Sequence, residues 1–293
     1  MSDVITLRDV CVRFGKREAL SNVSLRFRGG VLVVMGPNGA GKTTLLNVLS
    51  GLIVPHYGEC RLLGIDCRLL PKLGATPPYV RESLPPSRMR VSELVEYVST
   101  FKDLDADLMR ENLRVLGLDP SIAWLKGLNT LSAGERIKVY VSLALSIRSE
   151  LYLLDEPNRN LDQGSRGRLR RLIEELVKRG SSFVITTHVY EYVDDLATDV
   201  LILKEGKVIF SGPAKGGEAS GLCVAWFDEG SRDAVTRLLS SLGLSVVSLG
   251  TGKVVFKCDR DSAARLLGVK GVSRVEVGGL RALYASVVGA DEL

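Results

Sequence analysis

Residues 36–43, GPNGAGKT, have the types and spacing that point most directly to chemistry. They fit the pattern GxxxxGK[ST], in which glycines leave room for phosphates and successive backbone N–H groups point into one concavity. Lys42 would add a cation for the β- and γ-phosphates of a nucleotide, and the Thr43 hydroxyl would be a ligand for Mg²⁺. The pattern predicts a nucleotide site, and its alternative is a Gly-rich turn without a ligand.

A second group of reactive residues is the acid pair in LYLLDEP, residues 151–157. At the carboxyl end of a buried parallel strand, two adjacent carboxylates can both reach one cleft. Asp155 would hold Mg²⁺, through water, and Glu156 would act as a general base on an attacking water. The alternative is a surface turn after a strand, but the phosphate loop upstream favours the functional interpretation.

Residues 131–135, LSAGE, open a long helix. Ser132 is a natural N-cap, and a helix N-terminus with a small, Gly-containing entry can bind an anion. Alone, the segment would be only a capped helix.

The elements that must position these groups alternate between strands and helices. The apolar run 31–35 predicts a buried strand, and an amphipathic helix follows the phosphate loop. Five prolines between residues 71 and 90 exclude a regular helix or a central strand there. Further strands are predicted over 4–14, 21–28, 59–65, 151–155 and 182–187, a hairpin over 199–212, and helices over 92–101, 107–116, 135–147 and 165–179.

Residues 212–221, GPAKGGEASG, read as a linker. Beyond it the order of predicted elements resembles a ferredoxin-like split βαβ pair, without a catalytic constellation. Its strands are predicted over 222–227, 244–249, 252–258 and 272–278, and its helices over 231–242 and 261–268.

Composition sets bounds on the class of protein. The 293 residues allow one large domain and one small one, and the net charge of +5 is spread along the chain, so no nucleic-acid partner is expected. Neither a signal peptide nor an apolar run of membrane-spanning length is found. The five cysteines are an odd number without a CxxC pair, and we interpret them as reduced packing residues of a cytosolic protein.

Five motifs in order resemble the nucleotide-binding subunits of ABC transporters. They are GPNGAGKTT, LSAGE, LYLLDEP, Asn160-Leu161-Asp162 and His188 after two threonines, and the likeness covers residues 4–213. The resemblance implies an α/β, P-loop NTPase fold: an ABC ATPase core with an antiparallel β-subdomain and a helical subdomain. The expected domains are 1–213, the ATP-binding domain, and 214–293, a small ferredoxin-like α+β accessory domain.

The resemblance also implies roles for single residues. His188 would contact the γ-phosphate and orient Glu156 and water, and Asp162 would link two active sites. Thr43 and Asp155 would hold Mg²⁺. ATP would be bound by the residues Phe14 (stacked on adenine), Gly36, Pro37, Asn38, Gly39, Ala40, Gly41, Lys42, Thr43 and Thr44, and in trans, from a second subunit, by Ser132, Ala133, Gly134 and Glu135.

The chain departs from the family pattern in three places, and one of them is the stretch before the Asp155 strand, residues 146–150, which lacks the usual proline. The family usually has a Gln between the phosphate loop and LSAGE that contacts Mg²⁺ and the membrane partner, and here Pro78 falls at the matching place, with Glu82 as a possible substitute. The only Gln is Gln163, after the acid pair. Glu135 stands where Gln is commoner and adds a negative charge near an anion site.

The resemblance implies an ATP-hydrolysing subunit whose homodimer traps ATP and drives transmembrane permease subunits. The chain would be cytoplasmic and peripheral on the inner face of the membrane. Export is favoured over import because an extra C-terminal domain, ending in the amphipathic segment 280–289, resembles that of many exporter ATPases. The alternatives are a non-transport ABC ATPase and a slow ATP-binding switch. The C-terminal domain could serve dimer contact, which we favour, partner docking or ligand sensing.

Overall fold

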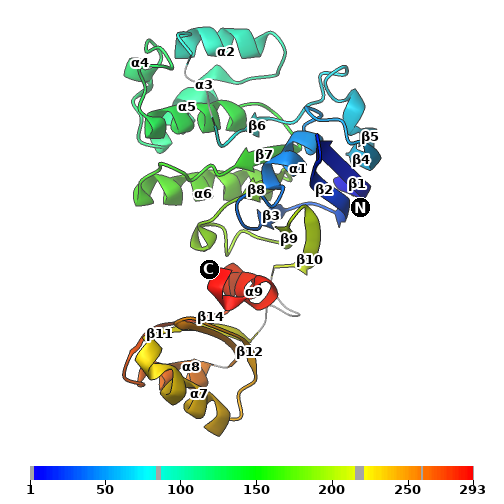
Figure 1. The fold of residues 1–293 in the computed structure, drawn as a ribbon. Helices are drawn as coiled ribbons and strands as arrows, with labels where there is room; N and C mark the ends of the chain where they lie inside the picture. The colour runs from blue at the N-terminus through cyan, green and yellow to red at the C-terminus, as the bar shows by residue number, and fades with distance from the viewer. Residues whose placement is uncertain (1–2, 84–86, 215–220, 259, 293) are drawn as a thin grey trace. The chain divides into compact units, whose positions relative to one another are not determined.

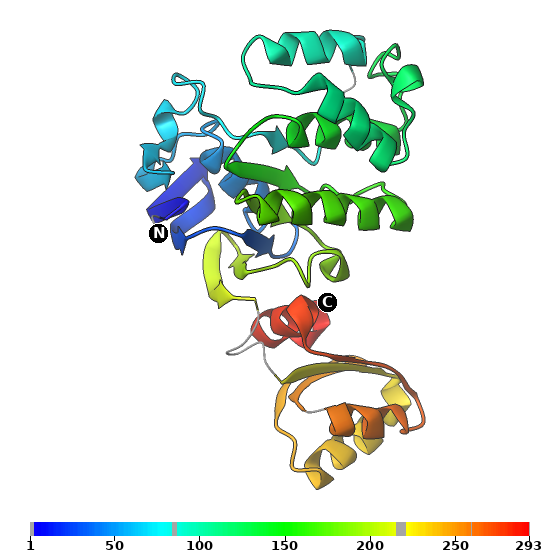
Figure 2. The ribbon, with the colours of Figure 1, turned by 180° about the vertical axis from the view of Figure 1, so that it is seen from behind.

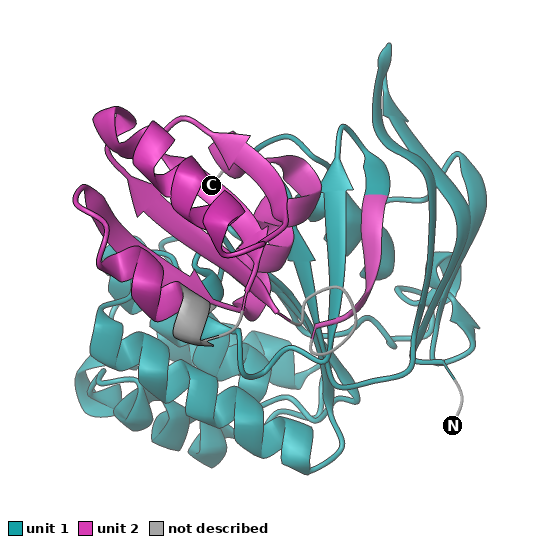
Figure 3. Cartoon of the chain, turned by 90° about the horizontal axis from the view of Figure 1, so that it is seen from below, with its two compact units in different colours: residues 1–208 teal, residues 209–293 magenta. Residues whose placement is uncertain are grey.

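The computed structural model describes residues 3–83, 87–214, 221–258 and 260–292. The chain divides into two compact units, residues 1–208 and 209–293 (Figure 3). The strand β10 (Lys207–Pro213) crosses this division and neighbours β9 in the sheet of the first unit. In the described part of the chain, no helix has both the length and the apolar character needed to cross a membrane.

A six-stranded sheet forms the centre of the first unit, in the order β10-β9-β3-β8-β7-β6 (Figure 1). The strands from β9 to β6 run parallel to one another. Every residue of β3, β7 and β8 is buried, which explains their mainly apolar sequences. The bounds are β3 (Val31–Met35), β6 (Tyr79–Val80), β7 (Leu151–Asp155), β8 (Ser182–Thr186) and β9 (Asp199–Lys204).

A second, antiparallel sheet lies beside this core, in the order β2-β1-β4-β5. Its inward side chains share one apolar cluster with helix α1 (Lys42–Leu49) and with β3, β7, β8 and β9, so α1 is packed between the two sheets. The expected antiparallel β-subdomain is therefore present. Its strands are β1 (Ile5–Phe14), β2 (Arg17–Phe27), β4 (Tyr57–Leu62) and β5 (Ile65–Asp66), followed by the short helix η1 (Cys67–Leu69).

A helical subdomain separates β6 from β7 in sequence. Its helices meet in an apolar cluster of their own, away from the sheets. The predicted helices agree with the observed ones within about two residues, the usual uncertainty at helix ends. The observed bounds are α2 (Val91–Ser99), α3 (Ala106–Val115), α4 (Pro120–Ala123) and α5 (Ala133–Leu145); α6 (Gln163–Lys178) and η2 (Tyr190–Tyr192) belong to the core (Figure 2).

The second unit has a four-stranded antiparallel sheet in the order β12-β13-β11-β14. With two helices between the strands, this is the βαββαβ arrangement that the sequence predicts. One sheet face packs on α7 and α8, and the other packs on α9. The elements are β11 (Leu222–Phe227), η4 (Glu229–Ser231), α7 (Arg232–Ser241), β12 (Val246–Gly250), β13 (Lys253–Lys257), α8 (Arg260–Leu267), β14 (Val272–Val277), α9 (Gly279–Val288) and η5 (Ala290–Glu292).

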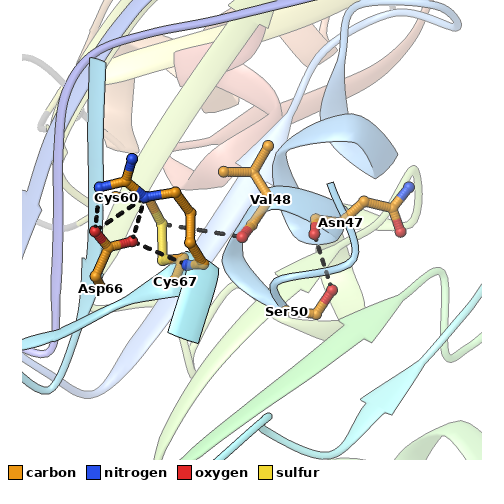
Figure 4. The surroundings of a disulfide bond; sticks show 7 residues. Asn47, Val48, Ser50, Cys60, Asp66 and Cys67 are labelled. Carbon is orange, nitrogen blue, oxygen red and sulfur yellow. Dashed lines mark hydrogen bonds and ion pairs between the residues drawn. A yellow bond between two sulfur atoms is a disulfide. The ribbon is translucent and has the colours of Figure 1, made fainter. Parts of the chain in front are cut away.

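Two disulfide bonds correct our interpretation of the cysteines as reduced. Cys60 pairs with Cys67 (Figure 4) and Cys223 with Cys258, at Cα–Cα distances of 5.4 and 6.0 Å, within the range of disulfides. Only Cys11 is unpaired, and it is buried. Antiparallel strand pairing brings these sulfurs together: Cys258 directly follows Lys257, the partner of Leu222. Sequence spacing does not reveal such pairs.

Candidate functional site

The phosphate loop joins β3 to α1 and can be built only with glycine at its tightest points. A Cβ atom on Gly36 would lie 2.2 Å from the Leu203 carbonyl oxygen, and one on Gly41 would lie 2.6 Å from that of Ala19. Both glycines have positive φ angles. The loop is therefore packed closely against β9 and β2, and it leads directly into the N-terminus of α1.

The Lys42 ammonium lies within this loop. It donates hydrogen bonds to the carbonyl oxygens of Gly36 (2.7 Å) and Pro37 (3.1 Å). Burial lowers the pKa of Lys42, and the nearby carboxylates of Glu156 and Asp155 oppose that shift. A cation is thus held between the loop and the acid pair.

Asp155, the last residue of β7, is 1 % exposed and accepts hydrogen bonds from two hydroxyls. Thr43 donates to its Oδ2 at 2.8 Å, and Thr186, at the end of β8, donates to its Oδ1 at 2.5 Å. The two predicted magnesium ligands, Thr43 and Asp155, are therefore in direct contact. Thr186 did not figure in the sequence analysis, although it ends an apolar strand beside the acid pair.

Glu156 has a backbone conformation that side chains rarely adopt, with a φ of 52°. Its N–H is held by the hydroxyl (3.0 Å) and carbonyl (3.2 Å) oxygens of Thr186. Burial raises the pKa of its carboxyl group, which makes the carboxylate a stronger base. The carboxylate lies beside His188, whose backbone N–H donates a hydrogen bond to Glu156 Oε2 at 3.3 Å.

The His188 imidazole completes this group, with Nε2 3.3 Å from Glu156 Oε1. Burial lowers the pKa of His188, and the cations of Lys42 and Arg159 lower it further. The ring is therefore neutral near pH 7, and its two nitrogens supply one donor and one acceptor.

One pocket of about 320 Å³ collects most of the predicted site residues. Gly36 and Pro37 contribute through their carbonyl oxygens to Lys42. Three lining residues were not among the predicted ATP contacts: Arg17, Ala19 and Glu82. The predicted residues that line the pocket are Phe14, Asn38, Gly39, Ala40, Gly41, Lys42, Thr43, Thr44, Asp155, Glu156 and His188.

The pocket residue contributed by the β6 segment is Glu82, which we named as a possible substitute for the family's Gln, and not Pro78. The Pro78 carbonyl accepts a hydrogen bond from the Leu153 N–H (2.9 Å), at the entry to β6. Val80 pairs with Leu154 across the parallel strands, and Glu82 and Glu156 each lie two residues beyond this pair. A two-residue strand in a Pro-rich segment gives no periodic signal, so the sequence left both Pro78 and Glu82 as candidates for this position.

The LSAGE segment, residues 131–135, caps α5 and does not line the Lys42 pocket. Ser132 Oγ accepts from the Glu135 N–H at 3.1 Å, and Glu135 Oε2 accepts from the Ser132 N–H at 2.8 Å. Glu135 also forms an ion pair with Lys126. The negative charge that the sequence analysis flagged thus completes a capping box at the positive end of a helix.

Next to this segment, the turn after the acid pair leads to Asp162. A Cβ atom on Gly134 would lie 2.8 Å from the Asn160 carbonyl oxygen, and Ala133 lines a second pocket with Asn160 and Glu156. Asp162 is the N-cap of α6. Hydrogen bonds from the Ser165 hydroxyl and N–H lower the pKa of Asp162 to about 2, so it is ionised at neutral pH.

Comparisons with known proteins agree with this geometry. The family model described as ABC transporter matches residues 20–159. A relative from Pyrococcus furiosus, whose name places it among ABC transporter ATP-binding proteins, is 34 % identical over 220 residues, which cover 67 % of this chain and 78 % of the relative. A daunorubicin resistance ATP-binding protein of Streptomyces coeruleorubidus is 29 % identical over 99 % of this chain and 90 % of its own.

Solved structures of ABC transporter cassettes are also similar to this chain. MJ0796, a bacterial ABC transporter cassette solved as a dimer, is similar with a TM-score of 0.64 and 26 % identity, over 73 % of this chain and all of its own. Another structure of that cassette is a dimeric post-hydrolysis state bound to ADP and Pi. From the assembled motifs and these relatives, we conclude that the chain belongs to the ATP-binding proteins of ABC transporters and is an ATPase of the ABC type.

Proposed function

We propose that this chain hydrolyses ATP as one half of a homodimer and thereby drives export through membrane-spanning permease subunits. The observation that carries the proposal is the meeting of the phosphate loop with Asp155, Glu156 and His188 in one pocket. A cation, a hydroxyl–carboxylate pair and a buried base are what phosphoryl transfer to water requires.

The residues fit Mg²⁺ by their chemistry, because the Thr43 hydroxyl and the Asp155 carboxylate are hard oxygen donors in direct contact. These two residues would hold the ion, which, when bound, would neutralise charge on the β- and γ-phosphates. Lys42 and the backbone N–H groups of residues 38–44 would bind the phosphates themselves. Phe14, at the end of β1, would offer its half-exposed ring to adenine.

Glu156 is proposed as the general base. The oxygen of water attacks the γ-phosphorus, the bond to the bridging oxygen of ADP breaks, and the water proton passes to the Glu156 carboxylate. Its raised pKa suits that role. His188, neutral and 3.3 Å from the carboxylate, would orient Glu156 and the γ-phosphate.

The partner is proposed to be a second copy of this chain. Ser132, Ala133, Gly134 and Glu135 do not line the Lys42 pocket of their own chain, which supports a role across a dimer. The similar cassette solved as a dimer supports it further. Asp162 is ionised and forms an ion pair with Lys138 of α5, and it would then connect the two sites.

Export is proposed because the daunorubicin resistance relative matches nearly the whole chain, the C-terminal part included. We also propose that residues 1–213 form the ATP-binding domain and that residues 214–293 form an accessory domain that serves dimer contact. The chain would act at the inner face of the membrane, on its permease.

The test compares ATP turnover of the wild type with that of Glu156→Gln, with particle mass measured by light scattering at saturating ATP and Mg²⁺. The expected variant binds ATP, does not hydrolyse it and accumulates as a dimer. Hydrolysis at the wild-type rate by the variant would contradict Glu156 as the base. An inactive, monomeric wild type would favour the ATP-binding switch.

A further inference from the structure

The pocket holds one carboxylate more than the proposed chemistry uses. Glu82 lines it together with Asp155 and Glu156, so three acidic side chains share the space in which an anionic nucleotide would lie. Lys42 and Arg17 are the cationic side chains that line the same space. An uncompensated third carboxylate would repel the phosphates.

The Glu82 carboxylate has its own partner. The Arg159 guanidinium forms an ion pair and hydrogen bond with Glu82, and both residues line the second pocket, which shares Glu156 with the first. The parallel register of β6 and β7 brings the two together. Glu82 lies two residues beyond β6, and Arg159 follows the end of β7 by four residues.

The turn that carries Arg159 is closely defined. The Arg159 N–H bonds to the Glu156 carbonyl at 3.0 Å, and the turn is flanked by two residues with positive φ, Glu156 and Asn160. This turn brings Arg159 back to the β6 segment. Arg159 is also close enough to the site for its charge to act on His188.

The pair is too exposed to stabilise the fold. The side chains of Arg159 and Glu82 are 60 % and 40 % exposed, and ion pairs of this kind contribute little to the free energy of unfolding. We therefore expect the ion pair to affect nucleotide affinity, through the net charge of the pocket.

We propose that Arg159 is a positioning residue that holds the Glu82 carboxylate and neutralises it, so that the nucleotide phosphates meet two acidic side chains and not three. The inference rests on the proposed function, since it assumes that the pocket binds ATP. It assigns a role to Arg159, which the motif analysis passed over.

The test is a double-mutant cycle read by binding of Mg·ADP, which needs no hydrolysis. Arg159→Gln leaves Glu82 uncompensated, and we expect its affinity to fall about tenfold. The double variant Glu82→Gln/Arg159→Gln removes the repulsion and should bind within about threefold of the wild type. The loss in Arg159→Gln should also shrink at high salt, because salt screens exposed charges.

Arg8→Ala is the matched control, because the Arg8–Glu59 pair is also an exposed ion pair and belongs to β1 and β4. It should leave the affinity unchanged. The exchanged pair Glu82→Arg/Arg159→Glu keeps one charge of each sign and should bind Mg·ADP about as well as the wild type. It tests the inference even if Arg159→Gln does not fold.

Two results would overturn the inference. A double variant as weak as Arg159→Gln would mean that Arg159 contacts the nucleotide directly, and an unchanged affinity of Arg159→Gln would mean that Glu82 does not need compensation. Failure of the wild type to bind Mg·ADP would instead contradict the proposed function.

Discussion

Replacing Thr186 by valine removes one hydroxyl on which both halves of the acid pair depend. That hydroxyl donates to Asp155 Oδ1 and accepts from the Glu156 N–H, and Thr186 is fully buried. Valine has nearly the same shape, so the change is confined to these two hydrogen bonds.

The expected cost follows from the kind of each bond. A hydrogen bond to a charged group contributes about 1.5–3 kcal/mol, and a neutral one contributes about 0.5–1.5 kcal/mol. We therefore expect the free energy of unfolding to fall by about 2–4 kcal/mol. ATP turnover should fall at least about tenfold, because Glu156 loses one contact that holds its unusual backbone angle.

The assays are denaturant unfolding and ATP turnover, with Thr186→Ser and Thr187→Val as controls. Thr186→Ser keeps the hydroxyl and should keep most of the activity. Thr187→Val removes only neutral hydrogen bonds, one to the Asn158 side chain and one from the Val189 N–H, and should cost less than Thr186→Val. Thr186→Val with wild-type stability and turnover would refute the view that this hydroxyl organises the acid pair.

Three further predictions concern charge, disulfides and the second unit. The raised pKa of Glu156 means that its ionised form opposes folding; Glu156→Gln should be more stable than the wild type at neutral pH, and the difference in unfolding free energy should vanish below the ordinary Glu pKa of about 4.3. Alkylation of the unreduced, unfolded protein should label only Cys11 among five cysteines, and reduction should lower the unfolding free energy by about 2–4 kcal/mol per disulfide; labelling of all five would contradict the disulfides. Deleting residues 215–293 leaves β10 and the pocket intact, so calorimetry should find unchanged ATP affinity; lost affinity in the folded truncation would contradict a separate binding unit.

The phosphate loop and the acid pair could be predicted because each is local in sequence. A buried apolar run followed by Gly-rich residues or by two acids predicts a parallel strand. It also predicts that the following side chains lie at the carboxyl edge of the sheet. The contact between Thr43 and Asp155, 112 residues apart, then follows from the parallel sheet. The βαββαβ unit was found in the same way, from alternating patterns and turn residues.

The two disulfides were missed because they depend on which strands pair. The β4–β5 hairpin brings Cys60 to Cys67, and the pairing of β11 with β13 brings Cys223 to Cys258. Neither leaves a periodic pattern. The role of Glu135 was available in sequence, since Ser132 and Glu135 have the spacing of a capping box, but the charge was weighed only as a disturbance to anion binding.

The site also shows why its residues form one unit. The carboxyl ends of β3, β6, β7 and β8 lie at one sheet edge, and each contributes a group: the phosphate loop, Glu82, the acid pair and Thr186. Burying Asp155 and Glu156 side by side and bending the backbone at Glu156 both oppose folding. Hydrogen bonds from the neighbouring strand ends offset these costs, so the conformation of the base depends on the same contacts that hold the proposed metal ligand.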